Sequence, residues 1–249
     1  MLSKAKTKLI RSLEVKKRRD AEGLFVAEGP KAVESLCAAF EPVFVAAEPG
    51  WLAARRGLVG GAEVAEASPA ELAAAGFQKT PQSVLALFRK PAAGRPDIAG
   101  GGLYLALDGV QDPGNVGTIV RTAHWFGLAG VVCSPATADV FSPKAVQSTM
   151  GSLGAVPVFY SPLPQLLSSL PAGVEVCGAV LGGEDVYAAG VPRSGVLVLG
   201  SEGRGISPEV LPLLTRRVTI PAFSPQPPDS LNVAVAAAVL CSEARRAEG

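Results

Sequence analysis

The sequence predicts an α/β protein whose C-terminal part forms a parallel sheet covered by helices, preceded by a small α/β unit. After residue 102, short continuous apolar runs alternate with helical patterns, which is typical of strands buried on both faces of a sheet. Before residue 89 the predicted elements are short and mixed. A proline- and glycine-rich passage without periodicity separates the two regions, so we expect domains at 1–98 and 99–249.

In the first domain a basic helix within 1–20 is expected to precede several short strands and helices. One helix is expected to begin at Gly29-Pro30, because proline suits the first turn of a helix. Another follows Ser68, which with Glu71 has the spacing of a capping box. The strands are expected at 23–27, 42–47, 62–67 and 83–88.

In the second domain the apolar runs predict six strands, connected by helices. The last helix is expected over 230–246, with Asp229 or Ser230 as its cap. The strands are expected at 103–107, 131–133, 156–159, 174–180, 196–199 and 218–220.

Composition excludes several classes of protein. Apolar residues make up 48% of the 249 residues and charged residues 18%, yet no apolar run reaches the roughly 18 residues that span a bilayer. The basic start has no apolar run after it, so a signal peptide is not expected. Four widely spaced cysteines and a single histidine fit neither a zinc site nor a disulfide framework. We therefore expect a cytoplasmic protein with buried, reduced thiols, no metal and no membrane partner.

Charge is distributed unevenly along the chain. The net charge is +1, but residues 1–20 carry eight basic and two acidic side chains, about +6, so the remainder is about −5. This asymmetry is typical of a protein that binds a polyanion such as RNA, although a solvated basic helix without a partner gives the same pattern. The candidate RNA-binding residues are Lys4, Lys6, Lys8, Arg11, Lys16, Lys17, Arg18 and Arg19.

The first motif occupies residues 107–123. A strand is expected to end at Asp108, and a helix to begin near Asn115 as its cap. Core spacing places Val116, Ile119, Val120 and Ala123 on one face of that helix and Gly117, Thr118 and Arg121 on the other. A guanidinium near a helix N-terminus is suited to a phosphate, while an ordinary surface arginine is the alternative.

The second motif, 197–207, is a strand followed by a glycine-rich loop that matches neither phosphate-binding fingerprint. Its glycines indicate that something approaches the backbone closely, and Glu202 favours a neutral or cationic ligand; a plain turn is equally compatible. The third motif runs from a strand end at Ile220 through a proline-rich passage into an alanine-rich helix, which is either a site for close backbone approach or a simple capped amphipathic helix.

Together the three motifs resemble those of the SpoU (TrmH-like) family of RNA ribose 2′-O-methyltransferases, in the SPOUT superfamily. The matching stretches are 115–123, 199–203 and 230–234, and the resemblance extends over about 103–246. Upstream, 11–13 and 23–31 resemble the ribosomal-protein-like substrate-binding domain of longer members.

The resemblance implies a C-terminal domain with a deep trefoil knot, an exception to the rule that chains are unknotted. It implies S-adenosylmethionine as cofactor, a homodimer through the knotted domain, and methyl transfer to a ribose 2′-hydroxyl. The additional N-terminal domain, which would bind the RNA, favours ribosomal RNA over transfer RNA as the substrate. The implied catalytic residues are Arg121, Asn115, Glu202, Ser230 and Asn232. The implied cofactor-binding residues are Leu199, Gly200, Gly203, Ile220, Ala222, Ser230 and Leu231.

Several alternatives remain open. An arginine stays protonated at neutral pH, so Arg121 as a phosphate clamp and His124 as the base are alternatives to Arg121 as the base. The chain departs from the family in a longer, proline-rich 220–230 segment and in Ala222, where methionine is common. A non-catalytic RNA-binding or ribosome-assembly factor is the alternative function. A Rossmann-type nucleotide enzyme is disfavoured because both phosphate fingerprints are missing.

Overall fold

The computed structural model describes residues 1–246, which divide into two compact units. The first unit comprises Met1–Ala92 and Asp139–Ala155; the second comprises Ala93–Ala138 and the chain from Val156 onward. The segment Asp139–Ala155 therefore folds with the first unit, although it lies between two strands of the second unit in the sequence. The division into independent domains at 98/99 stays a prediction.

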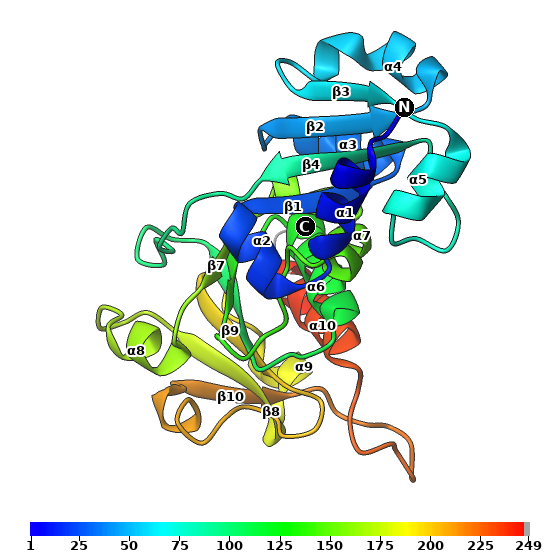
Figure 1. Ribbon diagram of the computed structural model, residues 1–249. Helices are drawn as coiled ribbons and strands as arrows, with labels where there is room; N and C mark the ends of the chain where they lie inside the picture. The colour runs from blue at the N-terminus through cyan, green and yellow to red at the C-terminus, as the bar shows by residue number, and fades with distance from the viewer. Residues whose placement is uncertain (247–249) are drawn as a thin grey trace. The chain divides into compact units, whose positions relative to one another are not determined.

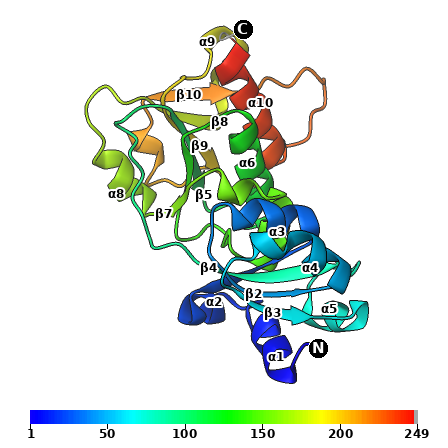
Figure 2. The ribbon, with the colours of Figure 1, turned by 90° about the horizontal axis from the view of Figure 1, so that it is seen from above.

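The first unit is built on a mixed sheet in the order β1-β4-β2-β3, antiparallel except for the parallel pair β2 and β3. Its strands are β1 (Leu24–Glu28), β2 (Pro42–Ala47), β3 (Glu63–Glu66) and β4 (Val84–Arg89). Its helices are α1 (Lys4–Ser12), α2 (Lys16–Glu22), α3 (Pro30–Cys37), α4 (Pro49–Arg55), η1 (Arg56–Leu58), α5 (Pro69–Ala75), α7 (Pro143–Thr149) and η2 (Ser152–Gly154). Helices α1 and α5 cover one face of this sheet, and α3 and α4 the other (Figure 2).

Alternation along the strands gives this sheet two apolar faces. In β1, Leu24 and Val26 join the core beneath α1 and α5. Phe25 points to the opposite face, where its ring lies 5.5 Å from the ring of Phe88 and 5.1 Å from that of Phe141, between centroids. Because Phe141 belongs to the segment Asp139–Ala155, this aromatic cluster is part of what holds that segment to the first unit.

The second unit is built on a sheet of six parallel strands in the order β10-β8-β9-β5-β6-β7. Helices α6 and α10 pack together on one face, and α8 lies on the other (Figures 1 and 2). The strands are β5 (Leu103–Asp108), β6 (Gly130–Cys133), β7 (Val158–Tyr160), β8 (Val176–Asp185), β9 (Gly195–Gly200) and β10 (Arg216–Thr219). The helices are α6 (Pro113–Trp125), α8 (Leu163–Ser168), α9 (Val186–Ala189), η3 (Leu211–Leu213) and α10 (Val233–Arg246).

The predicted α/β class and all six strands of the second domain are confirmed, with ends shifted by a few residues. The single basic helix was wrong: 13–15 break it into α1 and α2. The caps predicted for α6 and α10 were also wrong. Asp112 caps α6 through Gly114 N (3.1 Å), so Asn115 is the third residue of the helix and lies in its first turn. Asn232, rather than Asp229 or Ser230, accepts from Ala234 N (2.9 Å) at the start of α10.

Three of the four cysteines, Cys133, Cys177 and Cys241, are buried as the sequence predicted, whereas Cys37 is half-buried. Within residues 1–246, no disulfide joins any of them. Burial raises the pKa of the Cys177 thiol to about 11 and that of Cys241 to about 12, so both stay protonated at neutral pH. Across residues 1–246, the chain contains no helix with both the length and the apolarity needed to cross a membrane.

The capping box at the start of α5 is confirmed, since Glu71 N donates to Ser68 Oγ and Ser68 N donates to Glu71 Oε2. We expect Ser68→Ala to lower the free energy of unfolding by about 1 kcal/mol, because the first turn loses its side-chain acceptor. Urea denaturation followed by circular dichroism measures this change. Ser148→Ala, inside α7, is the control and should change stability by no more than about 0.5 kcal/mol. Equal effects of the two substitutions would contradict the assignment.

Candidate functional site

The strand order predicts a ligand-binding crevice at the carboxyl ends of β5 and β9. From β5 the chain proceeds to β6 and β7 on one side, whereas β8, β9 and β10 lie on the other side. Such a reversal of direction opens a crevice outside the strand ends, and ligands of α/β proteins bind there. Here Asp108, the last residue of β5, lies opposite Gly200, the last residue of β9.

The glycine-rich loop after β9 folds back on itself at this crevice. Ser201 and Gly205 pair through both backbone hydrogen bonds, at 3.1 and 2.9 Å. The carboxylate of Asp108 accepts from Ser207 N at 2.8 Å and so ties the loop to the end of β5. A Cβ on Gly200 would lie 2.0 Å from the carbonyl carbon of Gly205. The close approach that the sequence indicated at Gly200 is therefore made by the chain's own loop.

A chain of side-chain amides joins all three sequence motifs. Asn115 Nδ2 donates to Glu202 Oε1 at 2.5 Å, and Asn232 Nδ2 donates to Asn115 Oδ1 at 3.1 Å. Asn115 can bridge the other two because Asp112 has taken the capping role at the start of α6. The structure thus brings together three of the five predicted catalytic residues, from α6, the loop after β9, and the start of α10.

The predicted cofactor-binding residues lie on the two segments that border this network. Leu199 is buried within β9, Gly200 and Ile220 are half-buried, and Gly203 is exposed with open space around its Cα. Ala222, Ser230 and Leu231 are exposed on the segment between β10 and α10, which projects away from the sheet (Figure 1). Among residues 1–246, Ser230 finds no hydrogen-bond partner, so it does not join the network.

The face prediction for α6 is confirmed for its core, since Val116, Ile119, Val120 and Ala123 are fully buried. Thr118, Arg121 and His124 are exposed, but Gly117 is buried, contrary to the prediction. The Arg121 guanidinium makes no hydrogen bond or ion pair with any residue of 1–246. The structure of the single chain therefore does not bring Arg121 into contact with Asn115, Glu202 or Asn232.

Helix α6 is also fixed at its other end. Arg245, in the last turn of α10, donates from Nε to the carbonyl of Phe126 and from Nη2 to that of Gly127, both at 2.9 Å. These carbonyls end α6 and would otherwise lack partners in the helix. With the bond between Asn232 and Asn115, α10 is joined to α6 at both ends.

The candidate RNA-binding residues differ in exposure and in their partners, and Arg11 is both exposed and bonded within the chain. Lys6 pairs with Glu63 at 2.5 Å, Arg11 donates to the carbonyl of Gly76 and lies over the ring of Phe77, and Arg19 is buried. Burial withdraws the Arg19 guanidinium from any RNA surface. The exposed cations of α1 and α2 are Lys4, Lys8, Arg11, Lys16, Lys17 and Arg18.

The sequence did not predict two contacts that shape the candidate site: the hydrogen bond from Ser207 N to Asp108, and those from Arg245 to the end of α6. Asp108 could have been identified, because it is a carboxylate at the end of a buried parallel strand. No sequence pattern around Arg245 indicated that its side chain would cap α6. Within residues 1–246, no cluster of three or more histidine, cysteine, aspartate or glutamate side chains is arranged to hold a metal ion.

Two protein families match the chain. The SpoU rRNA Methylase family matches residues 102–242, and the MRM3-like substrate binding domain matches residues 4–86. Among solved structures, a TrmH-family protein from Porphyromonas gingivalis is 43% identical with a TM-score of 0.90, over 99% of both chains. An AdoMet-bound rRNA methyltransferase from Sinorhizobium meliloti is 30% identical with a TM-score of 0.86, over 99% of this chain and 96% of the other.

A curated relative is the Bacillus subtilis 23S rRNA (guanosine(2553)-2′-O)-methyltransferase RlmP. It is 38% identical over 165 residues, which cover 65% of this chain and 64% of RlmP. The chain thus spans less than two thirds of the length of this relative.

The loop geometry predicts different results for two neighbouring glycines. We expect Gly200→Ala to lower the free energy of unfolding by about 1–3 kcal/mol, because its Cβ would collide with the backbone of Gly205 and Ile206. Gly203→Ala is the matched control, since nothing lies within 4 Å of its Cβ position, and we expect a change within about 0.5 kcal/mol. Thermal unfolding and hydrogen exchange of residues 199–207 measure both effects. A tolerated Gly200→Ala would show that the loop is not closed as described.

Proposed function

Because the chain belongs to the SpoU rRNA methylase family, we propose that it methylates a ribose 2′-hydroxyl of RNA with S-adenosylmethionine as cofactor. The observation that carries the proposal is the network of Asn115, Glu202 and Asn232, which joins the three family motifs at the crevice. Ribosomal RNA is the favoured substrate, since RlmP acts on 23S rRNA and a substrate-binding domain matches residues 4–86.

The chemistry of the crevice fits this cofactor. When bound, S-adenosylmethionine supplies an electrophilic methyl group on a positively charged sulfur. Glu202 is exposed, its carboxylate is held by an amide rather than by a cation, and a positive ligand is therefore electrostatically favoured beside it. Gly200, Gly203, Ile220 and Leu231 would hold the cofactor from the two bordering segments. At Ala222 the chain offers only a methyl group where methionine is common in the family.

The chain's own residues would position the substrate rather than activate it through a metal. Arg121 presents a charged guanidinium on the exposed face of α6, suited to a backbone phosphate next to the target ribose. Asn115 and Asn232 fix the orientation of Glu202. The proton of the 2′-hydroxyl must pass to an acceptor. On α6 the imidazole of His124 is one candidate, and Arg121 is the other only if its guanidinium first loses a proton.

We also propose that the chain acts as a homodimer in the cytoplasm, with the trefoil knot of its family. Arg121 has no contact with the network in one chain, so a second copy could supply it across an interface. The packed helices α6 and α10 expose apolar side chains in support: Trp125 is 84% and Val235 50% exposed.

We expect the purified protein to transfer tritiated methyl groups to ribosomal RNA and less to transfer RNA. Arg121→Ala should lower kcat by roughly 100-fold or more, the scale for losing one acid–base or electrostatic group. Arg121→Lys should retain more activity if the charge binds phosphate, and His124→Ala tests the other candidate base. Arg95→Ala, an exposed arginine outside the site, is the control.

An unchanged rate for Arg121→Ala would overturn the catalytic assignment. If calorimetry detects no S-adenosylmethionine binding while RNA still binds, the protein is instead a non-catalytic RNA-binding or assembly factor.

The dimer is tested by Trp125→Asp. A buried charge in the centre of an apolar interface is costly, so we expect the variant to sediment as a monomer and to lose methyl transfer while still folding. Val64→Asp, at a 45% exposed apolar side chain of the first unit, is the control and should stay dimeric. Light scattering after gel filtration measures the mass. A wild-type chain that is monomeric at all concentrations would contradict the proposal.

A further inference from the structure

A buried arginine lies in the middle of the basic N-terminal segment. The side chain of Arg19 is 3% exposed and that of its partner Asp139 is 7% exposed. Arg19 donates to Asp139 Oδ2 from Nε at 2.9 Å and from Nη2 at 2.7 Å. Both residues belong to the first unit, Arg19 through α2 and Asp139 through the segment Asp139–Ala155.

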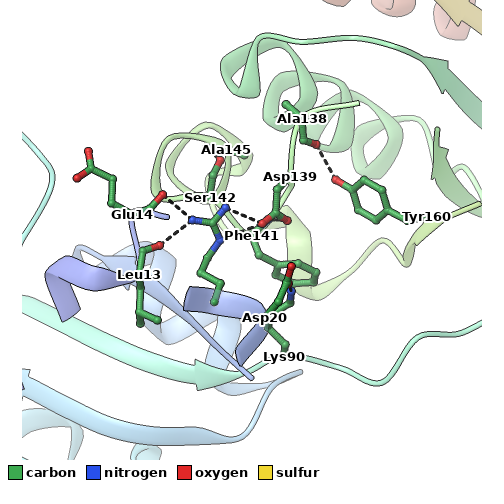
Figure 3. A network of polar contacts seen from close by, with 11 residues as sticks. Leu13, Glu14, Asp20, Lys90, Ala138, Asp139, Phe141, Ser142, Ala145 and Tyr160 are labelled. Carbon is green, nitrogen blue, oxygen red and sulfur yellow. Dashed lines mark hydrogen bonds and ion pairs between the residues drawn. The ribbon is translucent and has the colours of Figure 1, made fainter. Parts of the chain in front are cut away.

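The remaining nitrogen of the guanidinium closes the turn between the two basic helices. Arg19 Nη1 donates to the carbonyl of Leu13 at 2.7 Å and to that of Glu14 at 2.8 Å. These carbonyls lie where α1 ends and α2 is about to begin. Figure 3 shows the carbonyls of Leu13 and Glu14 on one side of the guanidinium and the carboxylate of Asp139 on the other.

Both partners are held from further points. Asp139 Oδ1 accepts from Phe141 N at 3.0 Å, which fixes the carboxylate. The next residue of α2, Asp20, accepts from Lys90 Nζ at 2.5 Å, and this hydrogen bond lowers the pKa of Asp20. Lys90 Nζ also lies 5.2 Å from the centroid of the Phe141 ring. Helix α2 is thus attached at two consecutive residues to the segment that begins at Asp139 and to the end of β4.

We propose that Arg19 and Asp139 are positioning residues for RNA: they set the angle between α1 and α2, and so the spacing of the exposed cations on both helices. Arg19 acts from the interior and does not touch the RNA. The cations that it arranges are Lys4, Lys8 and Arg11 on α1 and Lys16, Lys17 and Arg18 on α2. This inference rests on the proposed RNA substrate.

The physical reason is the geometry of the guanidinium. A planar fork can donate to a carboxylate and to two carbonyls at once in fixed directions, whereas a lysine ammonium is a point charge on a flexible stem. Phosphate contacts add to RNA affinity only if the cations match the spacing of the phosphates. A fixed turn between α1 and α2 provides that match without spending RNA-binding energy on ordering the two helices.

The test is RNA binding as a function of salt for Arg19→Lys and Asp139→Asn, with 23S ribosomal RNA as the probe. Neither substitution lowers the net charge, and Asp139→Asn raises it by one. General attraction to a polyanion therefore predicts equal or tighter binding. We expect the opposite: affinity lower by about fivefold or more, and a salt slope reduced by about 2, because the three α2 cations lose matched phosphates.

Glu41→Gln is the matched control. It also removes one acidic charge from the first unit, but from the exposed pair with Arg89, whose side chains are 66% and 58% exposed. We expect RNA affinity that is equal or slightly higher. Methylation kinetics add a second readout: Asp139→Asn should raise KM for RNA at near wild-type kcat, while calorimetry gives unchanged S-adenosylmethionine binding.

Asp20→Asn is a second variant, which we expect to fold even if Asp139→Asn does not, because Asp20 is 49% exposed. It too removes an acidic charge, and it should weaken RNA binding in the same direction with a smaller effect. Unchanged or tighter RNA binding by well-folded Asp139→Asn and Asp20→Asn would overturn the inference. A wild-type protein that methylates no RNA would instead overturn the proposed function, so the two failures are distinguishable.

Discussion

The parallel register between β5 and β9 is the constraint on which the crevice depends. It places Asp108 opposite Gly200, at the point where the strand order reverses. From there Asp108 can reach Ser207 and close the loop that carries Glu202. A shift of one residue would turn Asp108 to the other face of the sheet and open that loop. The glycine at 200 follows from the same geometry, since any Cβ there would collide with the returning backbone.

The helices α6 and α10 supply polar side chains, Asn115 and Asn232, to the site beside these strand ends. They are joined near their N-terminal ends by Asn232 and Asn115, and at the far end of α6 by Arg245. Near the N-terminus of α6, the Asn115 side chain accepts a hydrogen bond from Asn232. At its C-terminus, Arg245 donates to backbone carbonyls that have no partner within the helix. The site residues of α6 are consequently held by contacts from a segment more than a hundred residues later in the chain. Such contacts allow exposed polar side chains to keep one orientation.

In the first unit, a buried ion pair has an equivalent organising role. Taking an arginine and an aspartate out of water is costly, so a pair such as Arg19 and Asp139 is weak evidence for stability by itself. The hydrogen bonds from Arg19 to Leu13 and Glu14 instead specify one arrangement of two helices that both carry exposed cations. The same pair attaches a segment that the sequence places between strands β6 and β7. One ion pair thus fixes both the two basic helices and the segment Asp139–Ala155.

Local sequence was sufficient for features that depend on neighbours along the chain. Apolar periodicity identified all six strands of the second sheet and the buried face of α6, and spacing alone identified the capping box at Ser68. The three motifs also identified the family, whereas the roles of single site residues, the knot and the dimer stay predictions. Tertiary structure decided what depends on distant partners. Nothing near Arg19 indicates that Asp139, 120 residues away, would bury it. Likewise, nothing near Asn115 indicates that it would meet Glu202 and Asn232, which are 87 and 117 residues away. Periodicity reports which face of an element is apolar, but the partner of a polar group is fixed only when the chain has folded.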